Sequence, residues 1–134
     1  MGSEPIIAEL EKATEGLLFQ SESDYPFKPF LWKGAAQEPL TPQTLLRYTG
    51  HPDNSSVETT TLDDLFRIAT LDQNWHGPTE RNKVAKYRNL AKLLKEKLSD
   101  IQVFRVGSVK IDVYIVGATE SGDLVGLSTK VIET

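Results

Sequence analysis

Apolar residues recur at helical spacing from the start of the chain. In the stretch PIIAELEKATEGLL, Ile6, Leu10 and Ala13 fall on one face of a helix. Pro5 suits the first turn of this helix, because the backbone N–H that proline lacks has no helical partner there. Gly16 suits its end. The pattern therefore predicts a first helix between these two residues.

Two shorter helices are predicted by their capping residues. In TPQTLLRYTG, Thr41 suits the cap, Pro42 the first helical position and Gly50 the end of the helix. In TLDDLFRIA, Thr61 suits the cap and Asp64 follows it three residues later, which is close to a capping box. Both segments are therefore expected to be helical.

The strongest helical pattern covers residues 80–98, ERNKVAKYRNLAKLLKEKL. It has an apolar stripe that consists of Val84, Tyr87, Leu90, Ala91, Leu94 and Leu98. The same stretch is rich in lysine and arginine, which suggests either a nucleic-acid-binding face or a solvated face. Acidic residues dilute these cations and the whole chain is acidic, so a solvated face is the preferred interpretation.

Alternating patterns predict strands, most of them near the end of the chain. FKPFLWKG (residues 27–34) is expected to be extended, because its prolines disfavour a helix, and VETT suits a short strand. QVFRV and VKIDVYIVG flank Gly107-Ser108, a suitable two-residue hairpin turn. In the second of these strands, alternate residues are expected on one face: Val109, Ile111, Val113 and Ile115. A third strand, LVGLSTKVIET, follows the turn ATESGD. The fold class predicted is α+β, one domain over residues 1–134 that closes with an antiparallel β-meander.

Composition narrows the function without deciding it. No apolar run is long enough for a membrane helix, and no secretory signal is recognisable, so a cytoplasmic protein is expected. The absence of cysteine excludes thiol catalysis and cysteine metal sites. The net charge of −4 argues mildly against nucleic acid as the main partner, so no direct nucleic acid contact is expected.

An acidic loop, SESD (residues 21–24), interrupts apolar sequence on both sides. Glu22 and Asp24 would project to one side of an extended segment. Three readings are open: a surface turn, a catalytic carboxylate pair, or a surface that meets a positive partner. Catalysis needs two carboxyl groups whose pKa values are driven apart by burial, and the polar setting gives no sign of that. The two histidines, His51 and His76, are isolated from other ligand types in sequence, so no metal site is expected.

Two other features suggest a binding surface. Trp75 ends a polar loop, DQNW (residues 72–75), where it either packs on the core or anchors a partner. The last strand is expected to hold Thr134 in a defined place, and a terminal carboxylate is negative at neutral pH. Acidic side chains, an aromatic anchor and this carboxylate together suit a cationic, metal-containing cleft on another protein.

Several stretches resemble those of the nuclease A inhibitor family, small acidic proteins that block a non-specific, magnesium-dependent DNA/RNA endonuclease. The likeness covers nearly the whole chain, in GLLFQSESDYPFKPFLWKG, TGH, DQNW, VAK and DVYIVGATESGDLVGLSTKVIET. The first and last of these stretches are long and specific. The sequence around Trp75 departs from the family pattern: Asn74 stands where an aspartate is expected, and HGPTERNK follows the tryptophan where the family has acidic residues.

The resemblance implies a three-layer α-β-α sandwich like that of pathogenesis-related proteins. It also implies a protein with no enzymatic activity, no cofactor and no metal of its own, monomeric when free and bound 1:1 to its endonuclease. The partner-binding residues implied are Glu22, Asp24, Gln73, Asn74, Trp75 and Thr134, with the Thr134 carboxylate near the magnesium of the nuclease. The alternative is the same fold used to bind a different protein, and a hydrolase using Glu22 and Asp24 is the weakest reading.

Overall fold

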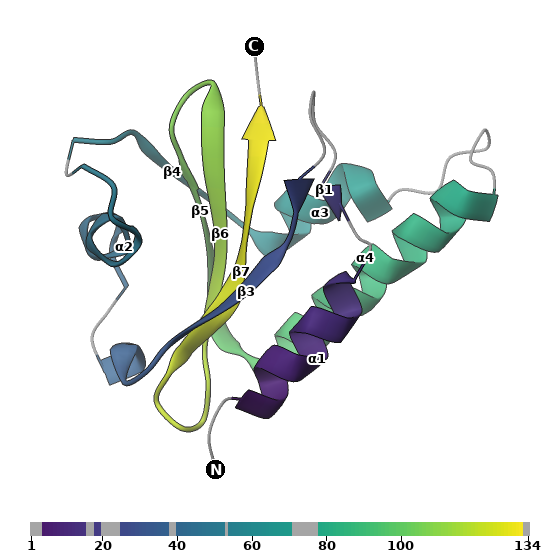
Figure 1. Ribbon diagram of the computed structural model, residues 1–134, viewed down its shortest axis with the longest axis horizontal. Helices are drawn as coiled ribbons and strands as arrows, with labels where there is room; N and C mark the ends of the chain where they lie inside the picture. The colour runs from purple at the N-terminus through teal and green to yellow at the C-terminus, as the bar shows by residue number, and fades with distance from the viewer. Residues whose placement is uncertain are drawn as a thin grey trace.

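An antiparallel sheet forms the centre of the molecule (Figure 1). The computed structural model describes residues 4–15, 18–19, 25–37, 40–52, 54–70 and 78–132. Within them the sheet has five strands in the order β3-β7-β6-β5-β4. Their bounds are β3 Lys28–Trp32, β4 Val57–Thr60, β5 Ser99–Val106, β6 Lys110–Ala118 and β7 Leu124–Ile132. A separate pair consists of β1 Leu18–Phe19 and β2 Tyr25–Pro26.

Helices cover both faces of this sheet (Figure 1). Their bounds are α1 Glu4–Thr14, α2 Pro42–Thr49, α3 Leu62–Thr70 and α4 Pro78–Lys97, with a 3₁₀ turn η1 at Ala35–Gln37. We call the sheet face that packs on α1, α3 and α4 the inner face, and the face towards α2 and η1 the outer face. The mixture of helices with an antiparallel sheet confirms the α+β class. No described helix is both long and apolar enough to cross a membrane.

The predicted caps are present. The Thr41 side chain accepts a hydrogen bond from the backbone N–H of Thr44 at 3.2 Å, and Thr61 accepts from Asp64 at 3.1 Å. Gly50 has φ 76°, and its N–H donates to the carbonyl of Leu46 at the end of α2. These contacts satisfy backbone groups that a helix end leaves without partners. Gly16, the expected end of α1, lies outside the described residues.

The closing meander is confirmed, and one of its turns differs from the prediction. The strands pair from Val106↔Asp112 in β5–β6 and from Lys110↔Ile132 in β6–β7. A two-residue turn at Gly107-Ser108 is wrong, because five residues separate the paired positions Val106 and Asp112. The Gly107 N–H instead donates to the carbonyl of Ser56 at 2.9 Å, which ties the connection to the segment before β4.

Two further boundaries differ from the expectation. Val109 does not continue the buried row of β6: it precedes the strand and its side chain is 51% exposed. β5 begins at Ser99, three residues earlier than expected, and its register shifts between Ser99 and Gln102. Asp100, with φ 51°, lies in this irregular stretch. Aspartate tolerates that left-handed conformation better than most residues, which permits the bulge.

Each face of the sheet has its own hydrophobic core. The inner core joins α1, α3 and α4 to β6 and β7; its fully buried side chains include Leu10, Leu90, Leu94, Val113, Ile115 and Leu127. The apolar stripe expected on the long helix is thus confirmed for its described side chains. The outer core joins α2 to the other side of the same strands and is built around Leu45, Leu46, Phe104 and Val116.

Gly126 lets two strands and an aromatic ring meet at the centre of the outer face. A Cβ added there would lie 1.7 Å from the carbonyl oxygen of Ile115 and 2.9 Å from Cζ of Phe30. Both distances are shorter than van der Waals contact allows. The Phe30 ring of edge strand β3 therefore packs directly over the backbone of β7.

We expect Gly126→Ala to lower the free energy of unfolding by about 3 kcal/mol or more, because the added methyl group forces backbone atoms apart. Ser128→Ala is the matched control on the same strand and face, and it should cost less than about 1 kcal/mol. Urea denaturation of both variants measures the difference. Equal stability of the two variants would contradict the close approach described here.

Candidate functional site

The six residues expected to contact a partner lie outside the described residues: Glu22, Asp24, Gln73, Asn74, Trp75 and Thr134. The elements that flank them are described. Their arrangement shows the position of the chain on either side of the acidic loop and of residues 71–77, and before Thr134.

The acidic loop joins two strands that pair with each other. Phe19 in β1 pairs with Tyr25 in β2, and Leu18 pairs with Pro26. Five residues connect the paired positions Phe19 and Tyr25, with Glu22 in the middle of this connection. This short ladder was not predicted, because two-residue strands carry too little alternation to be recognised in a sequence.

The base of the acidic loop lies beside β7, the last strand in the sequence. β1 and β2 both contact β7. Lys28 in β3 pairs with Ser128 in antiparallel orientation, so the chain before Lys28 runs alongside the residues that follow Ser128. The pairing of β7 with β6 continues to Ile132. The base of the acidic loop and the carboxyl end of β7 thus lie at one end of the sheet, the upper end in Figure 1.

Three aromatic rings, the aromatic triad, connect this end of the sheet to the helices. Phe27 follows β2, Phe66 lies on α3 and Tyr87 on α4. The ring centroids are 6.2 Å apart for Phe27–Phe66, 6.2 Å for Phe27–Tyr87 and 5.3 Å for Phe66–Tyr87, all edge to face. The three side chains are 6%, 2% and 3% exposed. Such pairs each contribute about 0.5–1.5 kcal/mol beyond the burial of their area.

The aromatic triad packs together the described residues that flank the two predicted loop segments. The residues between α3 and α4 include DQNW (residues 72–75), which we call the tryptophan loop. Phe66 precedes it in the sequence and Tyr87 follows it. Phe27 follows the acidic loop after two residues of β2. The helix pair that carries one segment is therefore packed against the chain that carries the other. The flanks of both predicted contact segments belong to a single packed unit.

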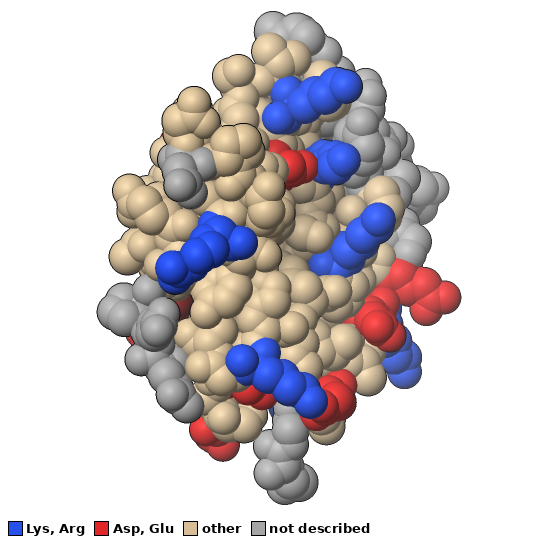
Figure 2. All heavy atoms as spheres, turned by 60° about the vertical axis from the view of Figure 1, so that its left-hand side comes forward, with Lys and Arg blue, Asp and Glu red and all other residues tan. Residues whose placement is uncertain are grey.

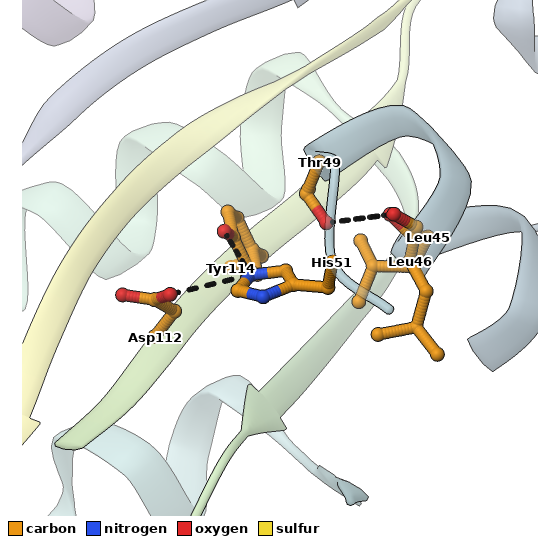
Figure 3. Close-up of polar contacts among 6 residues, drawn as sticks. All are labelled: Leu45, Leu46, Thr49, His51, Asp112 and Tyr114. Atoms are coloured by element: carbon orange, nitrogen blue, oxygen red, sulfur yellow. Dashed lines mark hydrogen bonds and ion pairs between the residues drawn. The ribbon is translucent and has the colours of Figure 1, made fainter. Parts of the chain in front are cut away.

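A second polar cluster lies where α2 meets β6 (Figure 3). His51 follows the end of α2, and its Nε2 lies 2.9 Å from the hydroxyl of Tyr114 and 3.2 Å from Oδ2 of Asp112. Nε2 therefore lies within hydrogen-bonding distance of a hydroxyl, which can donate or accept, and close to a carboxylate, which only accepts. Thr49 donates to the carbonyl of Leu45 at 2.8 Å in the last turn of α2. Sequence analysis did not connect His51 with β6, because sixty residues separate them.

Burial raises the pKa of the Tyr114 hydroxyl, and the negative charge of Asp112 raises it further, while a hydrogen bond with Thr49 lowers it by a smaller amount. A phenol with a raised pKa stays protonated at neutral pH and is a poor base or nucleophile. The described residues contain no group of three metal-ligating side chains. The contacts of this cluster therefore hold the end of α2 against β6.

Three cations of α4, Arg88, Lys92 and Lys95, line an open groove that also contains Phe66. The groove is lined by Asp63, Phe66, Arg88, Ala91, Lys92, Lys95 and Glu96. Lys95 pairs with Asp63 of α3 at 2.6 Å, and Lys92 approaches Glu96 at 4.0 Å. These contacts support the interpretation of this stretch as a solvated, self-paired face.

The raised pKa of Tyr114 predicts a loss of stability in alkali. Because the folded pKa lies above the unfolded one, the contribution of this group is fully present below about pH 10 and is lost as pH rises through the folded pKa. Tyr114→Phe should lower the free energy of unfolding by about 1 kcal/mol at pH 7, through the lost hydrogen bond. The gap between the two proteins should shrink above pH 10. Urea unfolding from pH 7 to pH 11 measures it, and parallel curves would contradict the prediction.

Comparison with known proteins identifies the family. A family model described as nuclease A inhibitor-like protein matches residues 4–134, nearly the whole chain. The search of curated proteins gives no match. The matched range spans every described helix and strand, including the β1–β2 pair, the aromatic triad and β7. The chain belongs to the nuclease A inhibitor-like family.

Proposed function

We propose that the protein inhibits a non-specific, magnesium-dependent DNA/RNA endonuclease by closing its active site in a 1:1 complex. The family match over residues 4–134 is the observation that carries this proposal. In this proposal the chain supplies no catalytic group and no metal. It acts by occupying the positions that substrate phosphates take.

The acidic loop is the first contact in the proposed complex. Glu22 and Asp24 place carboxylates near the cationic groups that surround the nuclease's magnesium ion. The support is the rigid base of the loop, because β1 pairs with β2 and Phe27 is fixed by the aromatic triad. A loop held at its base loses less conformational entropy when it binds.

The tryptophan loop is the second contact. Trp75 anchors the rim of the nuclease, with Gln73 and Asn74 beside it. An aromatic ring buries a large area at a low entropy cost, which suits an anchor. The support is the close packing of α3 on α4, which fixes the two helices that this loop connects.

The third contact is the carboxylate of Thr134, which reaches the metal site directly or through metal-bound water. The support is the pairing of β7 with β6 up to Ile132, two residues before Thr134. The same proposal includes the three-layer sandwich of pathogenesis-related proteins, for which the helices on both faces of the sheet are the support.

A different protein partner is the alternative function. Asn74 favours it, since the family pattern has an aspartate at this position. Capture by a magnesium-dependent endonuclease distinguishes the two functions, because the alternative predicts no such complex.

The protein is titrated into a non-specific, magnesium-dependent DNA/RNA endonuclease of the class that this family is expected to block. Nucleic acid cleavage should be abolished, with a break in the titration curve near one equivalent. The protein alone should cleave neither nucleic acid nor ester nor peptide. Residual cleavage is measured with a fluorescent substrate at nuclease concentrations well above Kd. A nuclease that stays fully active in excess protein would overturn the proposed function.

An extension after Thr134 should weaken inhibition far more than it weakens folding. It converts the carboxylate into a neutral peptide group and adds bulk at the proposed metal site, where a charge in a water-poor cleft is worth most. Melting temperature should be unchanged, because the last described pair, Lys110↔Ile132, is retained. Inhibition constants of untagged, N-tagged and C-tagged protein measure the effect. Should the C-tagged form inhibit as well as the N-tagged control, the carboxylate is not at the metal.

A further inference from the structure

Three lysines cross the upper part of the outer face in a diagonal row, which we call the lysine diagonal. Lys28 pairs with Ser128 on β7, so Lys130 lies one step diagonally from it. Lys130 pairs with Asp112 on β6, and Lys110 is the next diagonal neighbour. Side chains two residues apart on a strand share a face, so all three lysines project from the outer face. Diagonal neighbours on a sheet are about 7–8 Å apart.

These lysines are exposed and carry no ion pair within the described residues. Asp112 lies directly opposite Lys130 in the sheet, yet its carboxylate points to His51. Asp112 is therefore engaged by His51 and forms no ion pair with Lys130, although its carboxylate remains beside the row. Figure 2 shows basic side chains spaced down this face, with an acidic side chain between the uppermost of them and acidic surface beside the lowest. The surface between the cations is largely uncharged (Figure 2).

Three aromatic rings, the aromatic stack, continue the row below Lys28. Phe30 and Trp32 follow Lys28 on the outer side of β3, and their rings stack at 4.5 Å and 27°. Trp32 in turn stacks on Tyr48 of α2 at 5.0 Å and 15°. Tyr48 ends the stack with 40% of its side chain exposed. Arg47, also exposed, precedes it on α2.

We propose that the outer face binds single-stranded nucleic acid, with phosphates on the lysine diagonal and a base on Tyr48. This binding surface lies on the outer face, at the end of the sheet that also carries the flanks of the segments proposed to contact a nuclease. It uses none of the residues proposed for that contact and does not depend on that function. It departs from the expectation drawn from the net charge of −4, because the fold places several cations together on one face.

The combination of features favours nucleic acid over an acidic protein segment. A row of cations attracts any polyanion, but a flat aromatic surface in line with it suits planar bases. The rings within the aromatic stack already contact one another, so bases would lie on Tyr48 at its end. Base stacking is available only where bases are unpaired, so a single strand fits better than a duplex.

Fluorescence anisotropy of a labelled decathymidylate, with the full chain at 20–200 mM salt as the variable, tests the proposal. We expect saturable binding with a Kd of roughly 1–100 µM near physiological salt, the range of sequence-independent electrostatic binding, and a lower Kd at 20 mM salt. The triple variant Lys28→Gln/Lys110→Gln/Lys130→Gln should reduce the slope of log affinity against log salt by about 2, since each contact to a single strand contributes about 0.7.

The matched control neutralises three exposed lysines in the opposite layer, Lys12→Gln/Lys86→Gln/Lys97→Gln. It changes the net charge by the same amount and should leave the salt slope unchanged. An equal fall in both triple variants would mean that binding follows net charge alone, which overturns the proposal.

The aromatic contribution is tested separately. Tyr48→Ala should weaken decathymidylate binding at least about fivefold, and Tyr48→Trp should restore it. Circular dichroism checks that both variants are folded. If Tyr48→Ala does not fold, the salt slope of the unaltered protein still tests the proposal. No binding at 20 mM salt overturns the proposal. Equal affinity for a ten-residue polyglutamate, with no effect of Tyr48→Ala, would assign the face to acidic proteins and also overturn it.

Discussion

Edge-to-face packing of Phe27, Phe66 and Tyr87 is the interaction on which the proposed contact surface depends. Phe66 and Tyr87 lie on different helices and Phe27 lies between β2 and β3, and each ring is nearly inaccessible to solvent. Short-range packing of this kind fixes directions as well as distances, because protein interiors are dense and deform little. The flanks of two segments far apart in sequence are thus packed into one unit.

The sheet divides the charged residues of the chain between different surfaces. Cross-strand neighbours on the outer face place lysines from β3, β7 and β6 in one row, although they are separated by many residues in sequence. On the helical side, acids and bases pair with each other, as Lys95 does with Asp63. Net charge describes neither surface, because the local field depends on which side chains the register brings together.

Local sequence was informative wherever a local contact determines the structure. Thr41, Thr61 and Gly50 signalled helix ends through hydrogen bonds that span only a few residues. The α4 helix began two residues earlier than expected, at Pro78, which suits a first helical turn. The meander was predicted from the alternating apolar residues of β6 and β7. The family likeness was recognised from long sequence stretches spread over nearly the whole chain.

Contacts between distant residues were beyond such reasoning. The Gly107 N–H turns to Ser56 and so replaces the expected tight turn, which only the position of β4 explains. His51 looked isolated until β6 brought Asp112 and Tyr114 to it. The partner-contact residues were proposed from family resemblance, and the structure adds the position of their flanks. The aromatic triad was not predicted, because nothing in the spacing of Phe27, Phe66 and Tyr87 shows that they meet.

Edge strand β3 has a consequence for self-association. An open sheet edge offers unpaired N–H and C=O groups to any passing strand, including one from a second copy of the chain. Pro29, the second residue of β3, lacks the N–H that such an added strand would require. Its ring also keeps φ near one value and hinders a flat, regular ladder. A second molecule would therefore find a broken row of donors along this edge, and the sheet resists growing into fibrils from that side.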